Sequence, residues 1–305
     1  MRLRTFSEGV LVALDDSNVA VPVVKLFGRD GYLKRRVPIA IEGAARVNVY
    51  AVAHGRDGSV AATGSAYSSD GRGAVWLALT APDGNTQRVI RTNPFVPWQI
   101  AIAPDGACWA AGYEKQADGR VSKEHLMLRR FGPSGVQTGA YWPRSLFQTR
   151  PQYLHPTNYA MMVAGPDRMG WYSNATNEYV EWSLDGQMLV RLPGPELRNN
   201  DEVNGLGFCR DGAVYLSVSR ILKRPGPGKS SVWTATPASG AWFPVWDGLL
   251  PRAACCTAAT ERAWWRKPPW GPRSISTGSG SRETSARKLR RPEPGKYRVF
   301  QSMRE

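Results

Sequence analysis

Cysteine and histidine are scarce in this chain of 305 residues, which contains four of the first and three of the second. So few cysteines exclude a scaffold held together by disulfides. No run of 18 apolar residues occurs, which excludes a helical membrane span. A Gly-x-Ser-x-Gly nucleophile motif is absent, and the segment 226–230 is not a phosphate-binding loop, because Lys223 stands where that loop needs its first glycine.

The N-terminal region also lacks the features of a secretory signal. Asp15 and Asp16 interrupt the apolar run that begins at Val10, so no signal peptide is expected. We therefore expect a cytoplasmic location for the chain as given. If Met1 is an internal start, an export signal has been lost and the protein is exported.

The positive charge is concentrated at one end of the chain. The net charge is +15, yet residues 249–305 hold 13 Lys and Arg against 4 Asp and Glu, a net charge of +9. Residues 1–248 carry only +6. The high overall charge is thus weak evidence that the main part of the chain binds nucleic acid or a membrane surface.

Turn signals recur along residues 1–248 in two interleaved sets. In the first set each turn follows one short apolar run and precedes another; its members are Asp57-Gly58, Asp105-Gly106, Asp167-Arg168 and Asp211-Gly212. Four residues after each aspartate stand Ala61, Trp109, Trp171 and Tyr215. Because a large ring recurs at one position of the repeat, we interpret these aromatic residues as packing between repeats rather than as a surface for nucleic-acid bases.

The second set keeps an even more regular period. Its members are Asp30-Gly31, Asp83-Gly84, Ser134-Gly135, Asp185-Gly186 and Ser239-Gly240, with successive spacings of 53, 51, 51 and 54 residues. Glycine suits such turns because it tolerates the positive φ that a tight hairpin demands. The two sets together predict four-stranded antiparallel meanders at 47–92, 97–143, 158–194 and 204–246. A partial unit at 9–40 is expected to lack its first strand, and sustained helical periodicity is absent.

Meanders of four strands repeated at this length are typical of the blades of a β-propeller. The segments 102–112 (IAPDGACWAAG) and 210–217 (RDGAVYLS) resemble the blades of NHL-like and gluconolactonase-like propellers. The resemblance covers roughly residues 9–246 and is to the superfamily. The predicted fold is an all-β propeller with four complete blades and one partial blade, and about six blades in an intact parent. A β-sandwich with coincidental turn spacing is the less favoured alternative.

The alternating pattern stops after residue 248. Residues 249–305 are rich in Arg, Pro and Ser and contain Cys255-Cys256 and Trp264-Trp265. One interpretation is a disordered basic tail. The other is a frame-shifted remnant of a last blade, since a shifted reading of residues 260–266 permits an Asp-Gly turn followed by an apolar run. The nucleotide sequence decides between them.

Candidate site residues follow from the architecture, because propeller ligands sit near the starts of the innermost strands. The polar residues predicted there are Asn48, Gln99, Asn158, Asp201, Glu202 and Asn204. Their amide and carboxylate oxygens suit a hard cation or a sugar-like ligand. Gluconolactonase-like propellers hold a divalent metal with Glu, Asn and Asp, so the resemblance implies such a site here, although the residue offsets vary between repeats.

The remaining titratable residues favour structural roles. His54, His125 and His155 lack the mutual spacing of metal ligands, so no metal site is assigned and packing or surface roles are expected. Cys108 and Cys209 lie in predicted strands and are expected to be buried free thiols.

The sequence therefore favours a non-enzymatic binding or scaffold module without a cofactor. Its partner would be a small molecule or a protein, and it would be monomeric if the propeller closes. The first alternative is a lactonase-like hydrolase that uses a divalent cation at the mouth of the channel. The second is nucleic-acid binding through the basic tail, for which affinity would depend strongly on salt.

Overall fold

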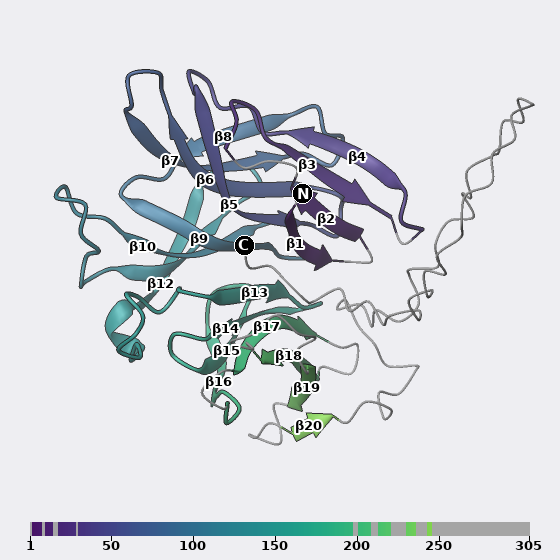
Figure 1. Cartoon of the computed structure of the whole chain (residues 1–305), viewed down its shortest axis with the longest axis vertical. Coiled ribbons are helices and arrows are strands. Elements are labelled where there is room, and N and C mark those ends of the chain that lie inside the picture. Colours follow the sequence, from purple (N-terminus) through teal and green to yellow (C-terminus); the bar gives the residue numbers. More distant parts are fainter. Residues whose placement is uncertain are drawn as a thin grey trace, which may run out of the picture.

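The computed structural model describes residues 2–7, 10–14, 18–28, 30–197, 201–208, 213–220, 230–235 and 243–245. Within these residues, twenty strands form five antiparallel four-stranded sheets, each with its strands in chain order (Figure 1). The only helical element in this described part is the 3-10 helix η1 (Arg144–Leu146). These repeated meanders confirm the predicted all-β propeller fold, and we number its sheets as blades 1 to 5.

The strands of each blade follow one another along the chain. Blade 1 contains β1 (Arg2–Ser7), β2 (Val10–Leu14), β3 (Val23–Phe27) and β4 (Leu33–Pro38). Blade 2 contains β5 (Arg46–His54), β6 (Val60–Tyr67), β7 (Gly73–Thr80) and β8 (Gln87–Arg91). Blade 3 contains β9 (Phe95–Ile102), β10 (Cys108–Glu114), β11 (Leu126–Phe131) and β12 (Gln137–Pro143). Blade 4 contains β13 (Ala160–Ala164), β14 (Arg168–Ser173), β15 (Glu178–Ser183) and β16 (Met188–Pro193). Blade 5 contains β17 (Asp201–Phe208), β18 (Val214–Arg220), β19 (Ser230–Ala235) and β20 (Phe243–Val245).

Blade 1 is more complete than the sequence predicted. β1 pairs with β2, from Arg2 opposite Leu14 to Ser7 opposite Val10. The expectation that this unit lacks its first strand is therefore wrong. The strand was missed because RLRTFS contains no apolar run and Glu8-Gly9 follows it instead of an Asp-Gly pair. The other four predicted units match blades 2 to 5 to within a few residues at most boundaries.

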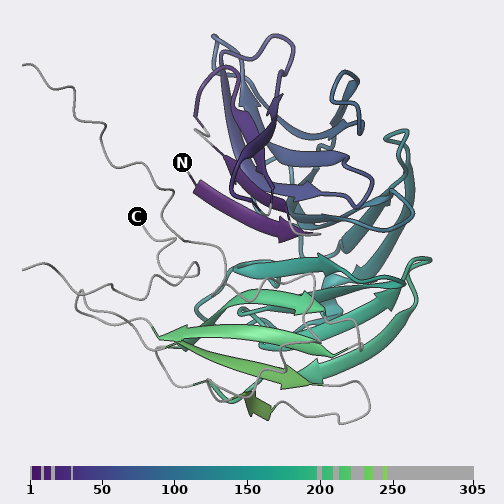
Figure 2. The same ribbon diagram turned by 90° about the vertical axis from the view of Figure 1, so that its right-hand side faces the viewer.

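The first strands of consecutive blades pack against one another, in the order β1, β5, β9, β13 and β17. The blades accordingly follow one another in space, from purple at the top of Figure 1 to green at the bottom, and Figure 2 shows the same succession from the side. A buried apolar cluster lies between each pair of consecutive blades in the described residues. The core is thus divided into layers between blades.

Burial along a strand depends on its place in the blade. In β6 every residue from Val60 to Ala66 is buried, because the middle of a blade is covered on both faces by its neighbours. In β16 exposed residues alternate with half-buried ones, since the outer strand has only one covered face. A strand that is covered on both faces has buried residues at successive positions, so its sequence does not alternate between apolar and polar residues.

The recurring aromatic residues serve the packing that the sequence predicted. Trp109 and Trp171 are 0% and 1% exposed. The Trp109 ring of blade 3 lies 5.7 Å from the Trp182 ring of blade 4, and the edge-to-face geometry is a favourable one for aromatic pairs. Cys108 is a buried free thiol, and burial raises its pKa to about 12.

Several sequence-based predictions lie outside the described residues, among them the turns Asp211-Gly212 and Ser239-Gly240. The buried thiol of Cys209 and the basic tail at 249–305, with its Cys255-Cys256 pair, lie outside them as well. No helix in the described part of the chain has the length and apolar character needed to cross a membrane.

Candidate functional site

The meander gives each blade two different ends. The turns after the first and third strands lie at one end, which we call the hairpin face. The turn after the second strand and the connection to the next blade lie at the opposite end, which we call the connection face. The hairpin face carries the regular Asp-Gly and Ser-Gly turns, whereas the connection face carries the longest described loop between strands, residues 144–159.

The first strands of four blades carry a β-bulge: the pairing register of β1 shifts across Arg4, and the three further bulges share one position in the repeat. The pairing register shifts across Tyr50 in β5, across Trp98 in β9 and across Asn204 in β17. Each of these residues stands seven positions before the aspartate of the following turn. A bulge bends its strand and re-aims the side chain of the extra residue, and bulges are over-represented next to functional sites.

A glycine on the neighbouring strand accompanies two of these bulges. A Cβ atom at Gly64 would lie 1.8 Å from the carbonyl oxygen of Asn48, and one at Gly112 would lie 2.0 Å from that of Val96. Both distances are far below van der Waals contact, so only glycine allows the second strand to approach the bulge. The bulges at Tyr50 and Trp98 are therefore built into the repeat.

The two bulged aromatic residues meet each other and two further rings. The Tyr50 and Trp98 ring centroids are 4.7 Å apart, and Trp98 lies 6.2 Å from Tyr113 of β10. His155, from the 144–159 connection, lies 4.3 Å from Tyr113 and 6.4 Å from Trp98. We call Tyr50, Trp98, Tyr113 and His155 the aromatic cluster. Tyr50 and Trp98 are half-buried, whereas Tyr113 and His155 are buried, so the cluster opens on the side of Tyr50 and Trp98.

The aromatic cluster is uncharged at neutral pH. Burial, together with the neighbouring His125 and Arg144 side chains, lowers the pKa of His155 to about 4. Burial also raises the pKa of the Tyr50 and Tyr113 hydroxyls. The Nδ1 atom of His155 lies 2.6 Å from the Thr157 hydroxyl, which holds the ring in place.

A second histidine near the cluster has a defined tautomer. The Nδ1 atom of His125 donates a hydrogen bond to the Ser122 carbonyl oxygen at 2.9 Å. Burial lowers the pKa of His125, so the ring is neutral and its Nε2 atom is an acceptor. This Nε2 atom is buried and has no hydrogen-bond partner in the described structure.

The structure places the polar residues predicted from sequence on or beside the first strands, but at different positions relative to the β-bulge. Asn48 lies two residues before its bulge, Gln99 lies one residue after, and Asn204 is the bulged residue itself. Asp201 and Glu202 open β17, opposite Arg220 and Ser219. Because side chains alternate in direction along a strand, residues at different steps do not form a matched ring.

Asn158 is already engaged in a turn. Its Oδ1 atom accepts hydrogen bonds from the backbone N–H groups of Leu154 and His155, both at 3.1 Å. The amide thus fixes the loop that carries His155, and only its Nδ2 group is left to donate to a ligand. That the six predicted residues converge on one ligand stays a prediction.

Sequence reasoning missed the aromatic residues of the cluster and gave His155 no binding role. The signal for two of them was present, because Tyr50 and Trp98 share the offset of seven from the turn aspartate. No comparable signal marks His155, which reaches Tyr113 through an irregular loop.

No group of three or more His, Cys, Asp or Glu that could hold a metal ion occurs among the described residues. The nucleic-acid alternative concerns a segment outside those residues.

A buried charged group in blade 4 has a structural role. Glu181 is 1% exposed, accepts a hydrogen bond from the Tyr179 hydroxyl at 2.9 Å and pairs with Arg168 at 3.1 Å. Burial raises the pKa of Glu181. Both carboxylate oxygens have a partner, so this network offers nothing to a ligand.

No protein-family model matches the sequence, and a comparison with curated proteins finds no relative. Among solved structures, a GH74 enzyme of Niastella koreensis is similar with a TM-score of 0.46 and 12% identity, covering 79% of this chain and 37% of its own. The GH74 xyloglucanase of Xanthomonas campestris is similar with a TM-score of 0.46 and 13% identity, covering 80% and 38%. The propeller domain of the Trilobed protease of Pyrococcus furiosus has a TM-score of 0.41 and 10% identity, covering 65% and 57%. The chain thus spans well under half of the two GH74 chains, and the chemistry of these proteins is not transferred to it.

Proposed function

We propose that this propeller is a non-enzymatic binding module that takes a neutral saccharide over the aromatic cluster of its connection face. The observation that carries the proposal is the contact between Tyr50 and Trp98. Two blades each present a half-buried ring from a β-bulge, and the rings lie 4.7 Å apart. If the two rings served only to pack the blades together, β5 and β9 would not need β-bulges at equivalent positions of the repeat.

The chemistry of the cluster fits a sugar. Aromatic rings offer an apolar surface for the C–H face of a sugar ring, while the phenol groups provide polar ends. Small-molecule sites are mostly apolar with a few placed polar groups, and beside the cluster the Asn158 side chain can donate through its Nδ2 group. Because the cluster is uncharged, a charged ligand would lose its hydration without finding a counter-charge there.

The test is a titration of the full chain with soluble cello-, xylo- and manno-oligosaccharides. Binding is measured by calorimetry and by tryptophan fluorescence. We expect saturable binding of at least one series, and Trp98→Ala should weaken it by more than about tenfold, as for a central aromatic contact residue. Trp98→Phe should retain part of the affinity because it keeps a ring. Tyr32→Ala is the matched control, since Tyr32 is 70% exposed in the turn before β4.

Two outcomes would contradict the proposal. If Trp98→Ala keeps its fold by circular dichroism and binds every series as tightly as the wild type, the cluster is not the binding site. If the wild type releases new reducing ends from a bound oligosaccharide, the protein is an enzyme and the non-enzymatic part of the proposal is wrong.

A further inference from the structure

Tyr159 ends the connection between blades 3 and 4 in a backbone conformation that is unusual for its residue type. Its φ is 50°, in the left-handed region that a bulky side chain rarely adopts. Among the described residues, Trp142 and Asn177 are the other non-glycine residues with a positive φ. Asparagine tolerates this conformation, and the buried Trp142 ring packs 4.8 Å from Trp182 in the core. Tyr159 has neither explanation, because its side chain is 57% exposed.

The backbone contacts of Tyr159 do not call for a tyrosine. Its carbonyl oxygen accepts hydrogen bonds from the backbone N–H of Asn174 at 3.3 Å and from the Nδ2 group of Asn174 at 2.9 Å. Glycine would make both contacts without steric cost, since it tolerates a positive φ. Backbone strain of this kind gathers at functional sites, so a strained residue with an exposed ring points to a function of the ring.

Tyr159 stands at nearly the same place in its blade as the two bulged rings of the aromatic cluster. Tyr50 and Trp98 lie seven positions before the aspartate of the following turn, and Tyr159 lies eight positions before Asp167. The first strands β5, β9 and β13 are neighbours in space. Each therefore presents an aromatic residue where the backbone departs from regular strand geometry, by a β-bulge in β5 and β9 and by the left-handed residue directly before β13.

The segment that ends at Tyr159 lies against the aromatic cluster. His155 belongs to the cluster, and the Asn158 side chain accepts the N–H groups of Leu154 and His155, both at 3.1 Å. Leu154 is 82% exposed, and the Tyr153 ring lies 5.8 Å from the Tyr159 ring. We call Tyr153, Leu154 and Tyr159 the outer patch. Exposed apolar side chains that gather in one place mark a surface for a ligand or a partner.

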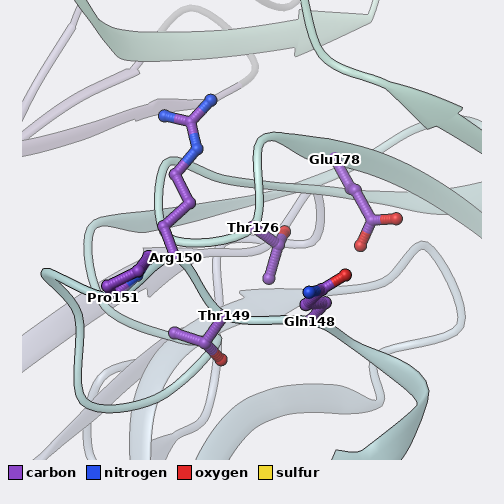
Figure 3. A pocket seen from close by; sticks show the side chains of 6 residues that line it. All are labelled: Gln148, Thr149, Arg150, Pro151, Thr176 and Glu178. Carbon is purple, nitrogen blue, oxygen red and sulfur yellow. The ribbon is translucent and has the colours of Figure 1, made fainter.

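The connection is also fixed to blade 4 at its other end. There it borders a pocket of about 310 Å³, and Figure 3 shows that the lining residues come from the connection and from the segment joining β14 to β15. The lining residues are Gln148, Thr149, Arg150, Pro151, Thr176 and Glu178. The Arg150 N–H donates to the Ala175 carbonyl oxygen at 2.8 Å, and the Arg191 side chain of β16 donates to the Leu146 carbonyl oxygen at 3.0 Å. The outer patch therefore belongs to an anchored loop, which reduces the entropy that binding would cost.

From this geometry we infer that the ligand is a linear saccharide of at least three residues, which runs from the aromatic cluster onto the outer patch. The inference rests on the proposed function for the class of ligand, and it adds the length of the ligand and its path across blades 2, 3 and 4. Each exposed ring offers an apolar surface to the C–H face of one sugar ring. A disaccharide would occupy the aromatic cluster alone, whereas a longer chain would also reach Tyr159. A protein partner suits the small outer patch less well, since a specific protein interface uses about 20 residues on each side.

The experiment compares the disaccharide, trisaccharide, tetrasaccharide and hexasaccharide of the cello-, xylo- and manno- series by calorimetry on the full chain. For the wild type we expect the affinity to rise from two to four sugar residues. Tyr159→Ala should remove that rise, so that the tetrasaccharide binds about fivefold more weakly and the disaccharide binds unchanged, as for the loss of one aromatic contact. Tyr159→Phe keeps the ring and should bind every length as the wild type does. Tyr32→Ala is the matched control, because Tyr32 is an exposed tyrosine of the hairpin face.

Tyr159→Gly separates binding from folding. It relieves the strained φ while it removes the ring, so the urea midpoint should not fall although the tetrasaccharide binds more weakly. The inference is overturned if wild-type affinity does not depend on length, or if Tyr159→Ala binds every length normally. In both cases loss of disaccharide binding in Trp98→Ala would leave the proposed function standing. Equal weakening of all lengths by Tyr159→Ala would also overturn it, because Tyr159 would then only support the cluster. If no series binds, the inference is wrong together with the proposed function.

Discussion

The hairpin face and the connection face differ in how their polar groups are satisfied. On the hairpin face the turn aspartates accept the backbone N–H two residues further on, as Asp57 does from Ser59 at 2.9 Å and Asp105 from Ala107 at 3.0 Å. On the connection face, buried atoms of His125, Thr149 and Thr176 have no partner within the described structure. The repeat therefore completes its own turns, whereas buried polar atoms without a partner are not confined to one face, since Arg35 Nε and Arg130 Nε beside the hairpin turns also lack one in the described structure.

The connections between blades show the same contrast. Residues 92–94 suffice to join blade 2 to blade 3, whereas residues 144–159 join blade 3 to blade 4. The longer connection includes η1, brings His155 to the aromatic cluster and forms one wall of the pocket. The same connection also contributes to the core, because Phe147 is 2% exposed and its ring lies 5.4 Å from that of Trp171.

The largest expected effect comes from removing the glycine beside a bulge. Gly112→Ala should destabilise the protein by about 4 kcal/mol, because the new Cβ atom meets the Val96 carbonyl and the strands must separate. Gly119→Ala is the control, since no atom lies within 4 Å of its Cβ position and only its φ of 82° opposes alanine. Urea unfolding measures both variants, and equal losses would show that the bulge does not depend on Gly112.

A somewhat smaller effect is expected from the titration of His155. Its folded pKa is lowered to about 4, so between pH 6.5 and 4 the unfolded chain binds a proton that the folded protein does not. Stability present above pH 6.5 should therefore be lost as the pH falls, by roughly 3 kcal/mol. Urea unfolding at several pH values should show a shallower dependence in His155→Gln. An identical dependence in both proteins would assign the loss to other groups.

The smallest expected effect comes from a hairpin turn. Asp83 accepts the Asn85 N–H at 2.9 Å in an exposed position, so Asp83→Ala should cost only about 1 kcal/mol. Because Asp83 lies on the face opposite the aromatic cluster, its substitution should leave oligosaccharide affinity unchanged. Thermal unfolding and the oligosaccharide titration check the two parts, and a loss of affinity would mean that the two faces are not independent.

Much of the fold could be predicted from the turn spacing, and less of the site. The period of the Asp-Gly and Ser-Gly turns located blades 2 to 5, because a hairpin turn is a local property of two or three residues. β1 was missed because charged residues interrupt its apolar pattern. For the site, the sequence pointed to the first strands of the blades and favoured amides such as Asn158, whose Oδ1 atom is occupied by its own turn.

By itself, the sequence determined the meander, its turns and the positions that pack between blades, since these depend on local backbone preferences and on which residues are apolar. Only the tertiary structure decided which rings meet and which polar atoms lack a partner. Trp98 and His155 are separated by a long stretch of chain, and their contact depends on a bulge and on an irregular connection that no repeat specifies. The same holds for Thr149 and Glu178, whose pocket exists only because the connection folds back onto blade 4.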